Sequence, residues 1–506
     1  MHPSHSSQPQ PHPLSQAGLR ALTPARPRAW PLSALALAAL LSACGGGDEI
    51  LNPIPEETRT QDSRQFTTGA VATTFSAMAA APGDGVDMAT TTRLAGVLGG
   101  AAYRVEIPVN WNGRLVMWAH GFRGEGPNLT VDNPPFRRHL IQQGYAWAAS
   151  SYSKNFYDVR VGVEDTNALA LAFNSIAANG GRTLAAPNRL YISGFSMGGH
   201  IAGAAIEAEA ATTARNKVTY NAALPMCGVM GDTELFNQFA AMQVTAQALA
   251  GRAAHPTNDF ASIRAAVTNT LFATFPSTPT PTGQAYLSVL QNITGGPRPL
   301  FFQGLAFGGS FPSAWGTFGS DGTVTGILNR NVLDTTGYTY VIDGDPTASA
   351  ALNASAQKLT AAPEANRLRR DGLRWIPKVN GQISIPVMSL HTLGDLFVPF
   401  SMQQVYQRRV TAAGNGQRLV QRAIRGASHC DFTVAEQVEA FDALVAWEQG
   451  GPRPAGDDVV TPATVAAPSY GCAFTRNTLG PDDAGFVGTL RAGIARSTAA
   501  CPAAGS

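Results

Sequence analysis

The most constraining feature of the sequence is a regular alternation of short apolar, strand-like segments with longer helix-like segments. The alternating pieces are, in chain order, 101–111, 114–121, 134–144, 145–152, 163–181, 189–193 and 197–211. Strands joined through a helix run parallel, because the crossover returns the chain to the same end of the sheet. The sequence therefore predicts an α/β fold, with a mostly parallel sheet and helices on both of its faces.

The alternation stops after a further strand-like segment at 221–231 and resumes only near residue 383. The segments that resume it are 383–395, 400–414, 419–426 and 433–449. The interval contains helix-like pieces at 232–251 and 261–275, and Gly- and aromatic-rich turns at 301–320. We therefore expect a core formed by 96–230 and 381–450, with a mainly helical lid inserted at 231–380.

The first residues of the chain have the pattern of an export signal. Arg20, Arg26 and Arg28 precede an apolar run at 31–41, which is too short to span a bilayer as a helix. The run ends in the sequence LSAC, which resembles the bacterial lipobox and implies a lipidated Cys44. An ordinary cleaved signal is the alternative. We expect a signal peptide at 1–44, a tether at 45–95 and an exported, lipid-anchored protein; Gly rather than Asp after the cysteine favours the outer membrane.

The charge balance argues against nucleic acid as a partner. The chain has 36 basic and 34 acidic side chains, so its formal net charge is only +2. Binding to a phosphate backbone needs a dense basic surface, and no stretch of this sequence provides one. The abundant glycine and proline are typical of a loop-rich exported protein, and residues 451–506 are expected to form a Pro-rich C-terminal extension.

The strongest chemical motif is the G-x-S-x-G sequence at residues 194–198, which follows a predicted strand and opens a predicted helix. A chain that turns so sharply holds the central residue in a strained conformation, and its neighbours Gly194 and Gly198 must lack bulk. The positive end of the helix also points at the site and favours a developing negative charge. The motif predicts Ser196 as a nucleophile.

This arrangement resembles the α/β-hydrolase superfamily, in which the nucleophile is followed along the chain by an acid and then a histidine. The sequence LHTLGDLFVP at 390–399 is similar to the acid loop of that superfamily and implies Asp395 as the acid. The sequence GASH at 426–429, before the last helix, is similar to its histidine loop and implies His429. The resemblance covers the core and leaves the lid and the C-terminal extension without a match.

The oxyanion hole that the resemblance implies needs two backbone N–H donors. One is the N–H of Met197, directly after the nucleophile, and the other is that of Phe122 in the sequence HGFRG at 120–124. Acyl transfer by such a site requires no cofactor. No metal site is expected, because His120 has no second ligand at a suitable spacing.

Four cysteines remain if Cys44 carries lipid: Cys227, Cys430, Cys472 and Cys501. An even number in an oxidising compartment indicates two disulfides, and three pairings are possible. Buried free thiols are the alternative. We favour Cys227 with Cys430, because both lie near the expected active site, and this choice pairs Cys472 with Cys501.

The chemistry favours hydrolysis of carboxylic esters, which could be small, aromatic or polymeric. A lid rich in Phe, Trp, Leu and Met suits an apolar or aromatic substrate, and no charged specificity pocket is evident. A peptidase or amidase similar to the prolyl oligopeptidases would use the same triad. A surface-binding lipoprotein without catalytic activity is the third alternative.

Overall fold

The computed structural model describes residues 58–72, 75–318, 320–498 and 501. The expected signal peptide, the lipidation site Cys44 and the first part of the expected tether lie outside these residues. Within the described ranges, no helix combines the length and the apolar character that crossing a bilayer requires.

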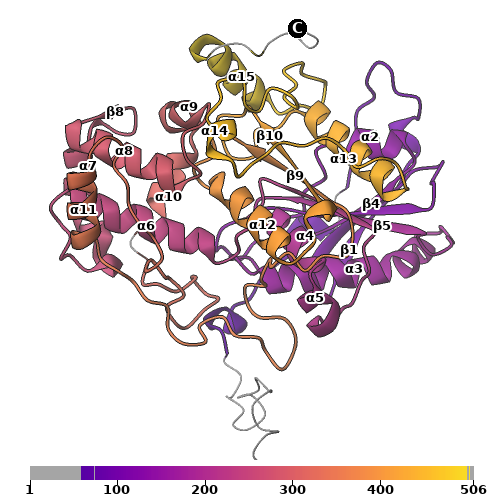
Figure 1. The fold of residues 1–506 in the computed structure, drawn as a ribbon. Helices are drawn as coiled ribbons and strands as arrows, with labels where there is room; N and C mark the ends of the chain where they lie inside the picture. Colours follow the sequence, from indigo (N-terminus) through magenta and orange to yellow (C-terminus); the bar gives the residue numbers. More distant parts are fainter. Residues whose placement is uncertain (1–57, 73–74, 319, 499–500, 502–506) are drawn as a thin grey trace, which may run out of the picture. The chain divides into compact units, whose positions relative to one another are not determined.

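An eight-stranded sheet forms the centre of the described chain (Figure 1). Its strands are β1 (Thr92–Leu98), β2 (Ala101–Ile107), β3 (Arg114–Ala119), β4 (Ala146–Ser150), β5 (Arg189–Phe195), β6 (Ala222–Met226), β9 (Val387–Thr392) and β10 (Leu419–Ile424). Their order across the sheet is β1-β2-β4-β3-β5-β6-β9-β10. Strand β2 is antiparallel to both neighbours and the other pairs are parallel. This order, with a sharp turn from β5 into the next helix, is the α/β-hydrolase fold, so the predicted fold class is confirmed.

In the strands between the two edges of the sheet, residues on opposite faces belong to two separate apolar cores. In β3, Leu115 and Met117 belong to one core, whereas Val116 and Trp118 belong to the other. The helices of the two faces are α3 (Val159–Asn179), α4 (Met197–Ala205) and α12 (Ser401–Ala412) on the first face, and α2 (Arg137–Gln142) and α13 (Val434–Glu448) on the second. Burial of the strands on both faces is what their nearly continuous apolar sequences predict.

The chain between β6 and β9 forms a helical lid, whose helices gather on one side of the sheet in Figure 1. Its elements are α6 (Glu234–Leu249), α7 (Phe260–Leu271), β7 (Phe272–Thr274), β8 (Thr278–Pro279), α8 (Pro281–Ile293), α9 (Phe301–Ala306), α10 (Ser310–Gly316) and α11 (Pro346–Ser355). The lid has an aromatic core of its own, in which Trp315 contacts Phe260, Phe272 and Tyr286.

Two short helices occupy part of the segment that was expected to consist of turns, residues 301–320. Helices α9 and α10 form there because Phe301 and Leu305, and then Phe311 and Trp315, recur at the spacing of one helical turn and are buried in the lid core. Gly308 and Gly309 lie between the two helices, whereas Gly304 lies within α9 and Gly316 ends α10. Because glycine favours turns, these residues had indicated turns along the whole segment.

The helix expected at 197–211 is two helices, α4 and α5 (Ala208–Thr213), separated at Glu207. The backbone of Glu207 is extended and forms an isolated bridge with Ile383. Its buried carboxylate accepts hydrogen bonds from the backbone N–H groups of Gly381 (2.8 Å) and Gln382 (2.9 Å), where the chain returns from the lid to the core. Burial raises the pKa of Glu207 to about 7.

Residues 58–72 and 75–91, which the sequence indicated as part of a tether, contact the core. Arg59 is buried and forms an ion pair with Asp158, the residue that caps the N-terminus of α3. Gln61 also donates a hydrogen bond to Asp158. This segment contains three short 3₁₀ helices: η1 (Thr60–Ser63), η2 (Gly69–Ala72) and η3 (Met88–Thr90). Two more occur in later connections: η4 (Thr257–Asp259) and η5 (Gly416–Arg418).

The C-terminal extension packs against β10, the strand at one edge of the sheet, and contains α14 (Pro462–Val465) and α15 (Gly485–Ser497). Val459 and Tyr470 pack with Ala423 of β10, and a disulfide joins Cys472 to Cys501. The buried guanidinium of Arg491 pairs with Glu436 of α13 at 3.0 Å, which fastens α15 to the core.

The buried carboxyl of Glu207 predicts a specific dependence of stability on pH. Its pKa is raised from 4.5 to about 7 in the folded state, so the folded protein holds this proton more tightly than the unfolded chain. The free energy of unfolding should therefore fall as the pH rises from 4.5 to 7. Glu207→Gln should remove about 3 kcal/mol of this loss. Urea unfolding of the wild type and of Glu207→Gln between pH 4.5 and 7 measures this difference in the free energy of unfolding. Identical pH profiles of the two proteins would contradict the raised pKa of Glu207.

Candidate active site

Ser196 lies on the sharp turn between β5 and α4, with φ 57° and ψ −119°. Its backbone N–H donates to the carbonyl of Met226 at the end of β6 (3.1 Å), which fixes the turn. A Cβ added at Gly194 would lie 2.5 Å from the carbonyl oxygen of Ala119, and one added at Gly198 would clash with the same carbonyl. The two glycines are therefore required by close backbone packing, as the motif predicts.

Asp395 and His429 are brought together at the ends of the neighbouring strands β9 and β10. One carboxylate oxygen of Asp395 contacts His429 Nδ1 at 2.6 Å, and the other accepts the backbone N–H groups of Phe397 and Val398 at 2.9 Å each. The carboxylate is fully buried. Because Nδ1–H donates to it, the lone pair of the neutral ring is on Nε2, for which no hydrogen-bond partner occurs among the described residues.

The loop that carries His429 is held on both sides of the histidine. Thr392 at the end of β9 donates its hydroxyl to the carbonyl of Ser428 (2.7 Å). The carboxyl of Asp431 is buried and accepts the N–H of Ala427 (3.0 Å). Burial raises the pKa of Asp431 to about 7. Asp431 therefore shapes the loop, whereas Asp395 contacts the ring.

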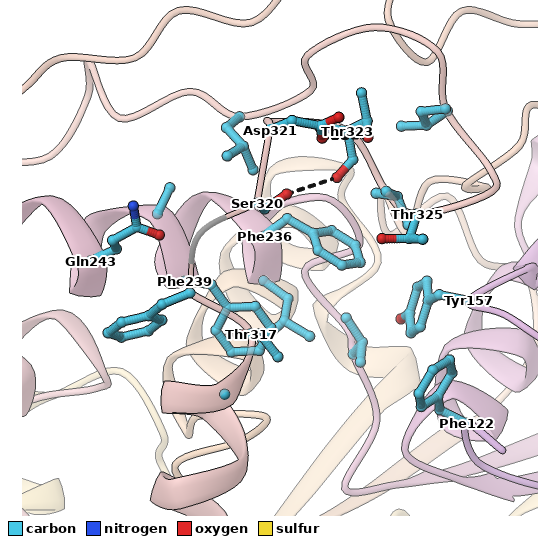
Figure 2. A pocket seen from close by; sticks show the side chains of 18 of the residues that line it. Phe122, Tyr157, Phe236, Phe239, Gln243, Thr317, Ser320, Asp321, Thr323 and Thr325 are labelled. Atoms are coloured by element: carbon cyan, nitrogen blue, oxygen red, sulfur yellow. Dashed lines mark hydrogen bonds between the residues drawn. The ribbon is translucent and has the colours of Figure 1, made fainter. Parts of the chain in front are cut away.

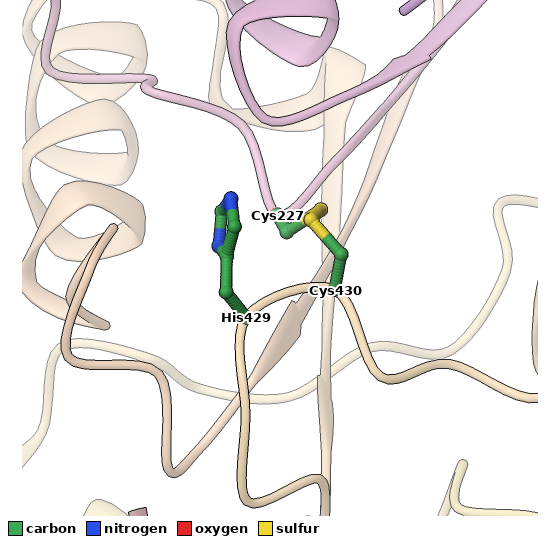
Figure 3. Close-up of side chains that lie close together, drawn as sticks. All are labelled: Cys227, His429 and Cys430. Carbon is green, nitrogen blue, oxygen red and sulfur yellow. A yellow bond between two sulfur atoms is a disulfide. The ribbon is translucent and has the colours of Figure 1, made fainter. Parts of the chain in front are cut away.

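A disulfide between Cys227 and Cys430 adds a covalent tie beside the histidine (Figure 3). Cys227 directly follows β6 and donates its N–H to Leu390 of β9 (2.8 Å), so it belongs to the rigid end of the sheet. Cys430 is the residue after His429. Both pairings favoured from the sequence, this one and that of Cys472 with Cys501, are present in the structure.

The same close group of Cys227, His429 and Cys430 has the residue types of a metal site, but its chemistry does not fit one. A metal binds the thiolate form of cysteine, and both sulfurs are engaged in the disulfide. His429 also uses Nδ1 for the contact with Asp395.

Two backbone donors lie next to Ser196. Met197 is the first residue of α4, and the N–H groups of a first helical turn have no partner within the helix. The loop after β3 passes close to the serine, since a Cβ added at Gly121 would lie 3.2 Å from Ser196 Cβ. The next residue of that loop is Phe122, whose N–H has no acceptor among the described residues.

The orientation of the Phe122 N–H depends on His120. The ring of His120 is buried, stacks on Tyr152 and places Nδ1 2.7 Å from the carbonyl of Gly121. Its Nε2 lies farther, at 3.1 Å, from the carbonyl of Ser151. Burial lowers the pKa of His120 to about 4, so the ring is neutral, and we place its proton on Nδ1, the nitrogen with the shorter contact. Because a trans peptide points its C=O and N–H in opposite directions, holding the Gly121 carbonyl directs the Phe122 N–H away from His120.

Ser196 lines two cavities. The larger, of about 910 Å³, lies under the lid, and the smaller, of about 740 Å³, extends toward α13 and α15. Phe122 and Phe397 line both cavities, and His429 lines the smaller one. A bond in contact with Ser196 would therefore have room for one substituent on each side.

Sequence reasoning missed two contributors to the site. Phe397 contacts the ring of His429 edge to face, with centroids 5.5 Å apart, and packs on Phe239 of the lid. Arg298 is buried in the lid and donates from Nε to the carbonyl of Leu393 (2.8 Å), so its positive charge lies behind the turn that carries Asp395. Burial lowers the pKa of Arg298 to about 9. The position of Phe397 two residues after the acid was a usable signal, whereas nothing local marks Arg298.

The other histidines considered from the sequence have structural contacts. His391 is buried in β9, with Nε2 2.7 Å from the Val398 carbonyl, although it lies 3.8 Å from Asp395. His200 bonds to Tyr157, and His139 and His255 pair with surface aspartates.

No protein-family model matches the chain. Over 67 residues the chain is 30% identical to the o-phthalyl amidase of Xanthobacter agilis, a match that covers 13% of this chain and 15% of that protein.

Several solved structures are similar in outline. They include feruloyl esterase B from Aspergillus oryzae (15% identity, 72% of this chain and 81% of that chain, TM-score 0.39). Esterase 2 from Thermogutta terrifontis (13% identity, 72% and 97%, TM-score 0.32) and the acylaminoacyl peptidase of Pyrococcus horikoshii (9% identity, 73% and 43%, TM-score 0.34) are further examples. At these values the likenesses carry no argument about activity, and the fold assignment rests on the strand order.

The two disulfides provide a matched test of how His429 is positioned. Replacing Cys227 and Cys430 by Ala should lower turnover of an activated ester about 10-fold or more, because the histidine loop loses its tie to the sheet. Replacing Cys472 and Cys501 by Ala removes a disulfide within the C-terminal extension that is not attached to the histidine loop, and this change should leave turnover close to that of the wild type. The chain-entropy costs are comparable, about 5 and 4 kcal/mol for loops of 203 and 29 residues. Equal losses of turnover in folded samples of both variants would contradict a local role.

Proposed function

We propose that the protein is a serine hydrolase that cleaves carboxylic esters through an acyl-enzyme on Ser196. The observation that carries the proposal is the 2.6 Å contact between buried Asp395 and His429 Nδ1, which leaves the lone pair of Nε2 without a partner among the described residues. His429 and Ser196 line the same cavity, and Ser196 lies on a strained turn at the start of a helix.

In the proposed reaction, His429 Nε2 takes the proton of the Ser196 hydroxyl as its oxygen attacks the acyl carbon. The N–H groups of Met197 and Phe122 stabilise the oxyanion, and Asp395 stabilises the imidazolium. The proton then passes from His429 to the leaving alcohol. Water attacks the acyl-enzyme by the same sequence of proton transfers, and this step releases the acid and restores Ser196.

Esters are favoured because the lid cavity is largely apolar and aromatic. An amidase is the second candidate, and the observation that favours it is the 67-residue match to an o-phthalyl amidase. Matched pairs of chromogenic esters and anilides with the same acyl group separate the two. Higher kcat/KM for the anilides, after correction for their lower intrinsic reactivity, would assign the protein to the amidases.

We also propose that the protein is exported and held on a membrane, in the outer membrane by preference, through lipid on Cys44. Support comes from the basic residues, the short apolar run and the LSAC sequence that precede a Gly-rich stretch. Durable anchoring requires two or more acyl chains, as lipidation of such a cysteine provides.

The catalytic assignment predicts the behaviour of two substitutions. Ser196→Ala should abolish both ester turnover and labelling by a fluorophosphonate probe, with little change in melting temperature. Asp395→Asn should lower turnover by about four orders of magnitude, because the ring adopts the wrong tautomer. Asp431→Asn is the comparison, since that carboxyl contacts the loop rather than the ring and an amide oxygen can still accept the Ala427 N–H, so its loss of turnover should be far smaller. A wild-type protein that never labels at Ser196 would instead indicate a surface-binding protein, and near-normal turnover of Asp395→Asn would eliminate this acid.

The anchoring proposal predicts the outcome of one further substitution. Cys44→Ser should move the protein from the membrane fraction to the soluble exported fraction, while ester turnover per folded molecule stays the same. Fractionation and metabolic labelling with a fatty-acid analogue measure this. Membrane association that persists without the label would require a different anchor.

A further inference from the structure

We infer that the lid cavity selects an uncharged aromatic substituent that carries an O–H or N–H donor, and that it rejects the matching carboxylate. This inference rests on the proposed function, because it treats the cavity as one of the two places beside Ser196 where a substrate is held. It names a property of the substrate that neither the fold nor the triad determines.

Six aromatic residues line the cavity together with Ser196. They come from both the core and the lid: Phe122, Tyr157, Phe236 and Phe239, which are labelled in Figure 2, and also Phe318 and Phe397. Several contact one another, as with Tyr157 and Phe236, whose rings meet edge to face at 5.2 Å. A volume of about 910 Å³ is ample for a substituted phenyl ring with a short linker.

The ionisable residues that line this cavity are acidic. Glu125 and Asp321 lie at its exposed margin, and no Lys, Arg or His occurs among the described residues that line it. Asp321 accepts both the N–H and the hydroxyl of Thr323 (2.9 and 2.6 Å), contacts that lower the pKa of Asp321 and keep it ionised. A carboxylate that enters the cavity would lose its hydration without meeting a cation.

The wall also carries hydroxyl and amide side chains: Gln243, Thr257, Thr317, Ser320, Thr323, Thr325 and Asn329. Within its aromatic part, Tyr157 provides a hydrogen-bond acceptor, as the partners of His200 show. His200 Nε2 lies 2.8 Å from the carbonyl of Pro377, which can only accept, so Nε2 carries the proton. Burial lowers the pKa of His200, so the ring is neutral and Nδ1 has the lone pair. The hydroxyl of Tyr157, 2.8 Å from Nδ1, must therefore donate to it.

A phenol whose proton is committed in this way can only accept further hydrogen bonds. No donor to the Tyr157 oxygen occurs among the described residues. A substituent with an O–H or N–H group would satisfy this oxygen, whereas a carboxylate would place lone pairs against it. The negative charges of Glu125 and Asp321 and the acceptor oxygen of Tyr157 thus both favour an uncharged substituent that carries a hydrogen-bond donor.

The decisive experiment measures binding without turnover. Ser196→Ala protein is titrated calorimetrically with three probes: 3-phenylpropanol, its 4-hydroxyphenyl analogue and its 4-carboxyphenyl analogue. We expect the hydroxylated probe to bind about 10-fold more tightly than the unsubstituted one, and the carboxylated probe roughly 100-fold more weakly. Equal or tighter binding of the carboxylated probe would overturn the inference.

Tyr157→Phe in the same background tests the role of the phenol. The preference for the hydroxylated over the unsubstituted probe should fall to near unity, while the weak binding of the carboxylated probe persists. Tyr286→Phe is the matched control: it removes a buried lid hydroxyl that donates to the Met242 carbonyl (3.1 Å) and does not line the cavity. A hydroxyl preference that survives in Tyr157→Phe would refute the assignment of the acceptor.

Failure of the proposed function gives a different result. A wild-type protein that neither labels with a fluorophosphonate nor cleaves esters could still show the predicted order of binding, and the cavity would then be a binding site without hydrolysis. Loss of the binding order in a protein that does cleave esters would overturn the inference alone.

Discussion

The hydrogen bond between Asp395 and His429 joins two loops that follow adjacent parallel strands, β9 and β10. The carboxyl ends of parallel strands lie at the same edge of a sheet, so the strand order brings these residues together although a strand and a helix separate them in sequence. Strands β5 and β6 are the next neighbours on the same side. Ser196 follows β5 and Cys227 follows β6, and four consecutive strand ends therefore carry Ser196, the Cys227–Cys430 disulfide, Asp395 and His429.

The parts of this arrangement that could be predicted from the sequence are those with a local pattern. The turn at Ser196 is marked by its two glycines, and the Gly-Asp and Ser-His steps follow strands with clear apolar runs. Tertiary contacts decided the rest. Glu207 interrupts a helix-like sequence because its carboxylate binds the chain returning from the lid, and Arg298 reaches the acid loop from far away in sequence. No window of neighbouring residues contains either contact.

The two disulfides also depend on contacts between residues that are distant in sequence. The even number of cysteines and the expected oxidising compartment indicated two disulfides. The choice among the three possible pairings, however, depended on which strand ends lie together at the expected active site. Cys227 and Cys430 come together because β6 and β10 lie on either side of β9, so a sheet order is needed before the pairing follows. The lid is harder to predict than the core of the sheet. Its aromatic residues pack against one another in a separate core, and the spacing of apolar residues along the sequence does not distinguish turns from short helices there.

The N-terminal segment has a structural role beyond that of a tether. Asp158 caps α3 and also binds Arg59 and Gln61, so this segment holds the start of the helix. Tyr157 is the residue directly before that cap, and its hydroxyl bonds to His200, four residues after Ser196. One continuous set of contacts therefore links Arg59 to the wall of the lid cavity and to the helix behind the nucleophile. Because Asp158 is fixed by Arg59 and Gln61 and the Tyr157 hydroxyl is fixed by His200, the acceptor in the cavity is held in place before any substrate binds. Its contribution to selectivity therefore requires no rearrangement of the lid.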